Sequence, residues 1–199
     1  MQRNTETKKL IKQAFTLLMK EKGFQTLTVS DITRKAGINR GTFYLHYVDK
    51  YDLLEKLEND LINDLKDILL KKYDNHYDNP REIIPYQAIL SALYYVKNDF
   101  DFIQVLISEQ GDMAFINRFK DLLQKSMKEG ILKTGVLNYS RLGLPEDYAN
   151  EILLSSVAAV ILLWIKKGGI ESPEEIAQIV NKSKDISPYE LLILYFPFL

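Results

Sequence analysis

Residues 28–47 read TVSDITRKAGINRGTFYLHY, and this stretch decides the fold of the N-terminal part of the chain. Thr28 is a residue type that caps helix N-termini, and Asp31 follows three residues later near the positive end of the expected helix. Gly37 ends that helix, and Asn39 caps a second helix over about residues 40–47. Two short helices separated by a three-residue turn that contains glycine are typical of a helix-turn-helix.

The second helix of this motif has one apolar face and one face suited to nucleic acid. Phe43 and Tyr47 lie four residues apart, so they share a face, which we place against the first helix of the motif. At about 100° per residue, Gly41 and Leu45 then point directly outward. Gly41 removes bulk where the helix would approach DNA most closely, Leu45 can touch a thymine methyl, and Arg40 can donate two hydrogen bonds to a guanine edge. The predicted DNA-binding residues are Thr28, Ser30, Asn39, Arg40, Gly41, Thr42, Tyr44, Leu45, His46 and Lys50.

Three of these residues have a structural alternative. Leu45 can pack against another helix, Tyr44 can be a half-buried aromatic, and His46 can be an ordinary surface residue at a helix end. Lys50 is predicted to bind a phosphate because it begins the next helix, where backbone N–H groups and a cation meet. The prediction therefore depends on the joint pattern of turn, face and basic surroundings.

Charge is unevenly distributed along the chain. The net charge is −1, but residues 1–56 contain eleven Lys or Arg and six Asp or Glu, a net charge of +5. The remaining residues contain 15 and 21, a net charge of −6. A basic head on an acidic body indicates that only the head meets a polyanion.

The rest of the chain predicts an all-α protein. Apolar residues recur at spacings of three and four almost throughout, which is typical of amphipathic helices. The most apolar run, residues 152–165, is shorter than a membrane span and contains two serines, so we expect a buried helix and no membrane association. The polar start and the absence of cysteine favour a cytoplasmic protein without disulfides.

An enzyme is the first alternative class, and the residues argue against it. The chain has only two histidines, no cysteine and no phosphate-binding loop, so we expect neither catalysis nor a cofactor. Asp74, His76 and Asp78 could be drawn as a metal site, but alternate positions in a polar loop are more often solvated. We therefore expect no metal site.

Residues 10–54, roughly a quarter of the chain, resemble the DNA-binding domain of the TetR (tetracycline-repressor) family. The matching residues are Ala14, Gly23-Phe24, Thr28-Val29, Asp31-Ile32, Ala36-Gly37-Ile38, Gly41 to Tyr47, Lys50 and Leu53-Leu54. The resemblance implies an all-α dimer in which Thr42, Tyr44, His46 and Lys50 contact the DNA backbone. It also implies that Arg40, Gly41 and Leu45 lie nearest the bases. The C-terminal part loosely resembles the subgroup that includes dihydroxyacetone-kinase regulators.

The resemblance divides the chain into a helix-turn-helix DNA-binding domain, residues 1–49, and a helical regulatory and dimerisation domain, residues 50–199. In this family the last long helices build a dimer interface, and the middle helices often enclose an effector. The predicted interface residues are Ser156, Ala159, Val160, Leu163, Ile176, Ile179 and Val180. The residues predicted to surround a small, largely apolar effector are Tyr94, Tyr95, Phe102, Phe115, Phe119 and Tyr148, although ordinary core packing explains them equally well.

These observations predict a homodimeric transcriptional regulator, by family default a repressor, that binds a pseudo-palindromic operator. A monomer in which the last helices cover residues 152–165 is one alternative. An adaptor or co-regulator that acts through a protein partner is another, and intact DNA-facing residues favour the regulator.

Overall fold

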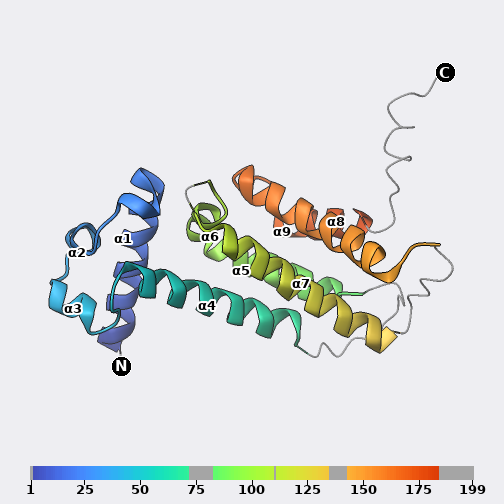
Figure 1. Ribbon diagram of the computed structural model, residues 1–199, viewed down its shortest axis with the longest axis horizontal. Coiled ribbons are helices and arrows are strands. Elements are labelled where there is room, and N and C mark those ends of the chain that lie inside the picture. The colour runs from blue at the N-terminus through green and yellow to red at the C-terminus, as the bar shows by residue number, and fades with distance from the viewer. Residues whose placement is uncertain (1, 72–82, 110, 135–142, 184–199) are drawn as a thin grey trace, which may run out of the picture. The chain divides into compact units, whose positions relative to one another are not determined.

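The computed structural model describes residues 2–71, 83–109, 111–134 and 143–183, and every regular element in these ranges is an α-helix (Figure 1). The all-α prediction is therefore confirmed. The helices are α1 (Gln2–Thr26), α2 (Val29–Ala36), α3 (Arg40–Tyr44), α4 (Lys50–Leu69), α5 (Tyr86–Asn98), α6 (Phe100–Leu106), α7 (Met113–Thr134), α8 (Glu146–Lys166) and α9 (Pro173–Ser183).

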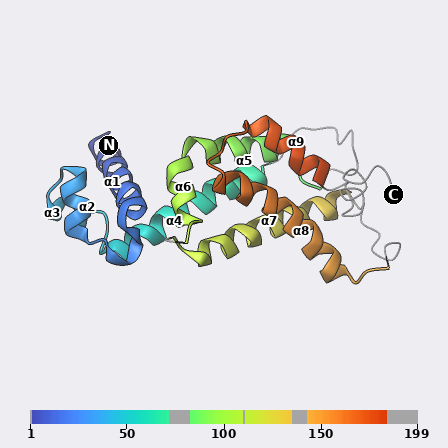
Figure 2. The same cartoon turned by 90° about the horizontal axis from the view of Figure 1, so that it is seen from above.

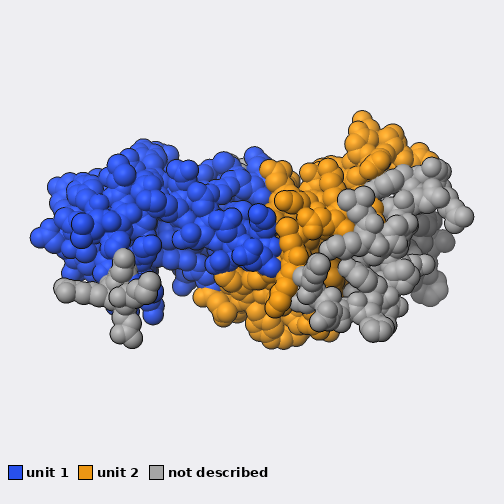
Figure 3. Space-filling view, turned by 90° about the horizontal axis from the view of Figure 1, so that it is seen from below, with its two compact units in different colours: residues 1–67, 99–119 blue, residues 68–98, 120–199 orange. Residues whose placement is uncertain are grey.

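The chain forms two compact units (Figure 3). Unit 1 comprises residues 1–67 and 99–119, and unit 2 comprises residues 68–98 and 120–199. The unit that holds the helix-turn-helix thus also includes most of α4, all of α6 and the start of α7. The functional boundary after residue 49 stays a prediction, because compactness and function need not divide a chain at the same place.

Unit 1 is built on α1, which contacts α2 and α6. The buried face of α1 includes Ile11, Phe15 and Met19, which recur at four-residue spacing and have no exposed surface. In α4 the same spacing buries a row of leucines: Leu53, Leu57, Leu61 and Leu65. These apolar stripes contribute to the hydrophobic core of unit 1, which holds the helix-turn-helix.

Unit 2 contains α5, α8 and α9, and α9 contacts both of the others (Figure 2). Trp164 of α8 is buried, and its indole N–H donates to the carbonyl of Glu171 at 3.0 Å. Ser172 and Glu175 form the reciprocal cap that starts α9: Glu175 N donates to Ser172 Oγ at 3.2 Å, and Ser172 N donates to Glu175 Oε2 at 2.7 Å. The connection between α8 and α9 is therefore well defined.

Helix α8 is the one helix in the described ranges that is long and apolar enough to cross a membrane by length and composition. The core helix of a soluble protein passes the same test, and a third of the apolar window of α8 is buried within the chain. The rest of that window leaves apolar side chains exposed, among them Ile152 and Leu163. Such an exposed apolar face needs cover.

Candidate nucleic-acid interface

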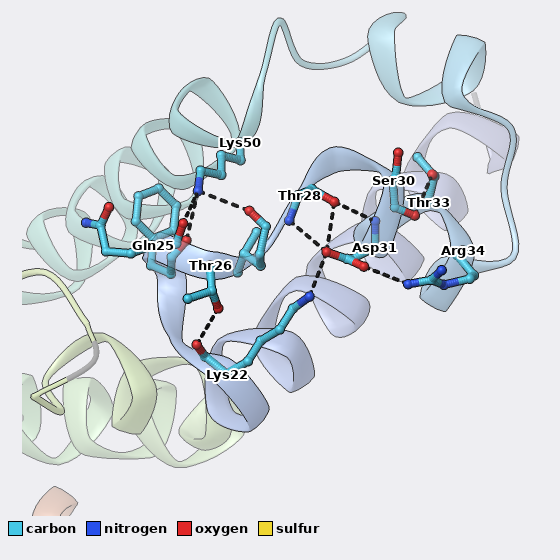
Figure 4. A network of polar contacts seen from close by, with 11 residues as sticks. Lys22, Gln25, Thr26, Thr28, Ser30, Asp31, Thr33, Arg34 and Lys50 are labelled. Carbon is cyan, nitrogen blue, oxygen red and sulfur yellow. Dashed lines mark hydrogen bonds and ion pairs between the residues drawn. The ribbon is translucent and has the colours of Figure 1, made fainter.

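The start of α2 is held by a reciprocal cap between Thr28 and Asp31 (Figure 4). Asp31 N donates to Thr28 Oγ1 at 3.2 Å, and Thr28 N donates to Asp31 Oδ2 at 3.0 Å. Lys22 and Arg34 also donate to the Asp31 carboxylate, each at 2.6 Å. The hydrogen bond from Lys22, followed by those from Thr28, holds the pKa of Asp31 well below its usual value. The ionised carboxylate therefore ties α2 to α1.

The turn between α2 and α3 has the left-handed glycine that the sequence predicts. Gly37 has φ 66° and ψ 30°, and Ile38 N donates to Thr33 O at 3.0 Å, which closes the end of α2. Asn39 then caps α3, because its Oδ1 accepts a hydrogen bond from Gly41 N at 3.0 Å. These local bonds set the angle between the two helices.

The residues on and after α3 that the sequence predicts to face inward are buried. Phe43 has no exposed surface, and Tyr47 is also buried. The Phe43 ring centroid lies 5.6 Å from that of Tyr44 and 5.6 Å from that of Tyr47. This aromatic cluster determines which side of α3 meets solvent.

The opposite side of α3 is open. Leu45 is 82% exposed and Tyr44 is 51% exposed, while Arg40 and Gly41 are also exposed. The alternative in which Leu45 packs against another helix therefore does not hold within the described part of this chain. Tyr44 is half-exposed, and Thr42 and His46 are partly covered at the sides of this face. We call Arg40, Gly41, Tyr44 and Leu45 the α3 outer face.

Arg40 is an available cation on the α3 outer face. Its guanidinium makes no hydrogen bond or ion pair with another residue in the part of the chain that the structure describes. Neighbouring cations are already paired: Lys22 and Arg34 with Asp31, Lys35 with Glu21, and Lys56 with Asp52. Arg40 can therefore donate to an external acceptor without breaking an internal bond.

Gly41 has no structural reason to be glycine. Its φ is not positive, and a Cβ built there would meet only Asn39 Oδ1, at an ordinary distance of 3.7 Å. Since the fold does not require a missing side chain at this position, the prediction that Gly41 lets a partner approach closely gains support.

Of the predicted DNA-binding residues at the helix starts, some side chains are already used in helix caps and one is free to bind an external group. Ser30 is exposed near the start of α2. Thr28 is exposed, but its hydroxyl also donates to Asp31 at 2.8 Å, and the Asn39 side chain is used in its cap. Thr28 and Asn39 therefore shape the surface, whereas Ser30 is free to bind a phosphate.

The structure commits the Lys50 side chain, which the sequence predicts to bind a phosphate, to partners inside the protein. Its ammonium donates to three backbone carbonyls, those of Phe24 and Gln25 at the end of α1 and that of Leu27 just after it (Figure 4). The first-turn amides of α4 are also occupied, because Tyr51 N and Asp52 N both donate to Asp49 Oδ1 at 2.8 Å. The sequence shows a cation at a helix start but not the carbonyls opposite it.

Sequence reasoning missed Val48, which is exposed just beyond α3. Val48 lies four residues after Tyr44, a spacing that could have placed it beside the predicted face. Its amide donates to Asp52 Oδ2 at 2.9 Å, so the backbone there is fixed.

The predicted interface residues separate into surface and core. Ala159, Leu163 and Ile179 are exposed, and Ser156 and Val160 are partly exposed. Ile176 and Val180 are buried within unit 2, so their assignment to a surface for a partner is wrong. The α9 periodicity showed an apolar face but not which neighbour covers it.

The predicted effector residues also divide. Phe102, Phe115 and Phe119 are buried in unit 1. Tyr94 and Tyr148 in unit 2 are 45% and 64% exposed, and the Tyr94 hydroxyl donates to Glu174. Exposed rings do not line an apolar pocket, so we withdraw these two. Tyr95 is half-buried. Asp74, His76 and Asp78 lie outside the described residues.

A capped α2, a glycine turn and a short α3 with an exposed outer face that carries an arginine define a helix-turn-helix DNA-binding protein. Residues 10–57 match the family model described as bacterial regulatory proteins of the tetR family, and residues 85–184 match a transcriptional regulator C-terminal region of TetR type. The chain therefore belongs to the TetR family of transcriptional regulators.

Individual relatives agree with this assignment. The chain is 28% identical over 173 residues to the uncharacterized HTH-type transcriptional regulator YxbF of Bacillus subtilis; the match covers 85% of this chain but only 42% of that protein. It is 28% identical over 174 residues to the HTH-type transcriptional repressor BepR of Brucella suis, covering 80% of this chain and 81% of BepR. The solved structure of the dihydroxyacetone kinase operon activator DhaS shares the fold, with a TM-score of 0.57, 24% identity, and coverage of 90% of this chain and 94% of that chain.

Proposed function

We propose that this regulator binds a pseudo-palindromic operator as a homodimer in the cytoplasm, represses transcription, and leaves DNA when a small, largely apolar effector binds. The α3 outer face is the observation that carries the proposal. It combines a guanidinium without a partner among the described residues, a glycine that the fold does not need and an exposed leucine on one side of a helix whose other side is buried. These are the group types that read base edges in the major groove.

Selection of random duplex fragments on the purified protein at moderate salt tests the proposal. We expect enrichment of an inverted repeat whose half-sites are about one helical turn apart, because two-fold symmetry places two α3 helices on one DNA face. A folded protein that enriches no sequence would contradict direct operator binding and favour the adaptor.

Arg40→Ala is expected to weaken binding to the enriched duplex by about 1–3 kcal/mol and to relax preference at one base pair in each half-site. The physical reason is loss of two hydrogen bonds to a base edge. Thermal unfolding should be unchanged, because Arg40 has no partner in the described residues. Lys35→Ala, which removes a cation already paired with Glu21, is the control and should keep base preference. Equal loss of affinity for all sequences in Arg40→Ala would instead assign Arg40 to a phosphate.

The dimer proposal is supported by one stripe along α8. Ile152, Ser156, Ala159 and Leu163 lie at spacings of three and four, so they share a face, and all four retain exposed surface. The two small residues allow close helix approach, and the large apolar residues gain from burial. Ile152 extends the predicted interface, and Ile179 of the neighbouring α9 is also exposed.

Leu163→Glu is expected to convert the dimer into a monomer, because it places a charge on the apolar stripe at Leu163, the large apolar residue at its C-terminal end, which is 58% exposed in one chain. Light scattering at micromolar concentration measures the mass. Leu17→Glu is the matched control, since Leu17 is an exposed leucine on α1 outside the stripe. A dimeric Leu163→Glu protein would place the interface elsewhere.

Repression is the family default, and BepR is named a repressor whereas DhaS is named an activator. A reporter with the enriched operator at its promoter distinguishes repression from activation.

Buried Phe102, Phe115 and Phe119 are the remaining basis for an apolar effector. A compound that releases DNA must bind the DNA-incompetent state more tightly. If no apolar or aromatic compound in a thermal-shift screen alters stability, the effector part of the proposal loses its support.

A further inference from the structure

We propose that Lys50 is a positioning residue for DNA recognition: its ammonium fixes the junction of α1 and α2 to the start of α4, and so orients α3. The inference rests on the proposed DNA-binding role of the α3 outer face. It replaces a phosphate contact with an internal clamp, formed by Lys50 Nζ and the carbonyls of Phe24, Gln25 and Leu27, which we call the Lys50 clamp.

The clamp has the geometry of a fully used ammonium group. Lys50 Nζ donates to the carbonyl oxygens of Phe24 at 3.0 Å, Gln25 at 2.9 Å and Leu27 at 3.0 Å. An ammonium has three protons, and all three are directed to protein acceptors. A phosphate bound by this group would have to displace one of these bonds.

The end of α1 supplies the Phe24 and Gln25 carbonyls because Gly23 interrupts the helix. Gly23 has φ 75° and ψ 159°, so the turn after it is a separate, very short helical segment. The last carbonyls of a helix lack partners within the helix and carry partial negative charge. A cation beside these carbonyls donates the missing hydrogen bonds and balances their partial negative charge.

Two aromatic rings complete the surroundings of Lys50. Its Nζ lies 4.9 Å from the Phe24 ring centroid and 5.3 Å from the Tyr51 ring centroid. These rings meet edge to face, with centroids 5.2 Å apart. Lys50 makes no ion pair in the described part of the chain, so carbonyl dipoles and ring faces balance its charge.

The Lys50 clamp affects DNA recognition indirectly, by holding the start of α2. Leu27, whose carbonyl it holds, is buried and directly precedes Thr28, the cap of α2. Lys50 itself begins α4, shortly after α3 ends at Tyr44. The α2–α3 pair is therefore held at both ends by one side chain, and a small error in its angle misplaces every base contact.

Lys50→Met tests the clamp because methionine keeps the unbranched chain and removes the cation. We expect faster amide hydrogen exchange in residues 24–32 and about tenfold weaker binding to the enriched duplex, measured where circular dichroism shows a fully folded protein. The slope of log affinity against log salt should stay at the wild-type value. Lys66→Met removes an exposed charge near the end of the same helix and is the control; it should change neither amide exchange nor DNA affinity.

Two results would overturn the inference. Unchanged exchange with a salt slope smaller by about 0.9 would make Lys50 a phosphate ligand. Faster exchange with unchanged affinity would make the clamp structural only. If the wild-type protein binds neither the selected pool nor a mixed-sequence duplex at low salt, the proposed function fails, while exchange in residues 24–32 still decides whether the clamp exists.

Discussion

Gly41→Leu is expected to abolish sequence-specific DNA binding while leaving the protein at least as stable as the wild type. Leucine has a better helix propensity than glycine by nearly 1 kcal/mol, and a Cβ at this position meets nothing closer than 3.7 Å. The same side chain would hold α3 away from the floor of the major groove. Affinity for the enriched duplex should then fall to that of non-specific DNA, a loss of about 10³-fold or more.

Paired measurements make this prediction specific. Chemical unfolding gives stability, and titration of labelled enriched and mixed-sequence duplexes gives the two affinities. Gln87→Leu is the matched control, because Gln87 is the second residue of α5 as Gly41 is of α3, and it is also exposed. Wild-type affinity in Gly41→Leu would mean that this part of α3 does not enter a groove.

The helix-turn-helix could be predicted because its determinants are local. Capping residues, a left-handed glycine and an i, i+4 aromatic pair act within a few residues of each other, and the structure has all of them. The direction of the α3 outer face follows from helical geometry once Phe43 and Tyr47 are placed inside.

The role of Lys50 could not be predicted, because its partners lie 23 to 26 residues earlier in the chain. A lysine at a helix start is compatible with an external anion or with internal carbonyls, and only the tertiary fold decides between them. For the same reason α9 periodicity identified Ile176 and Val180 as apolar but did not show that they face their own core.

Sequence reasoning passed over Glu58, a buried carboxylate with a shifted pKa. It sits on α4 beside the leucine stripe, and it is only 4% exposed. Arg118 Nη1 of α7 donates to its Oε2 at 3.1 Å, while its Oε1 is buried with no hydrogen-bond partner in the described structure. Burial with only part of its hydrogen bonds made destabilises the ionised form of a carboxylate.

Burial, together with the negative charge of Asp112, raises the pKa of Glu58 from 4.5 to about 7, against the opposing effect of Arg118. Between these values the folded state binds more protons at this site than the unfolded state does. Its contribution to stability is therefore complete in acid and is lost as pH rises toward about 7. A shift of this size corresponds to a loss on the order of 3 kcal/mol in the free energy of unfolding.

Glu58→Gln is expected to remove this loss, since an amide of the same shape stays neutral at every pH. The variant should match the wild type near pH 5 and exceed its free energy of unfolding at pH 8 by up to about 3 kcal/mol, measured by urea unfolding at intervals between. Glu55→Gln, an exposed carboxylate on the same helix, is the control and should follow the wild-type curve. Because the difference between two curves cancels every other titrating group, its dependence on pH belongs to Glu58. A difference that is constant with pH would mean that Glu58 is ionised in the folded protein throughout this range, and that Arg118 fully compensates for its burial.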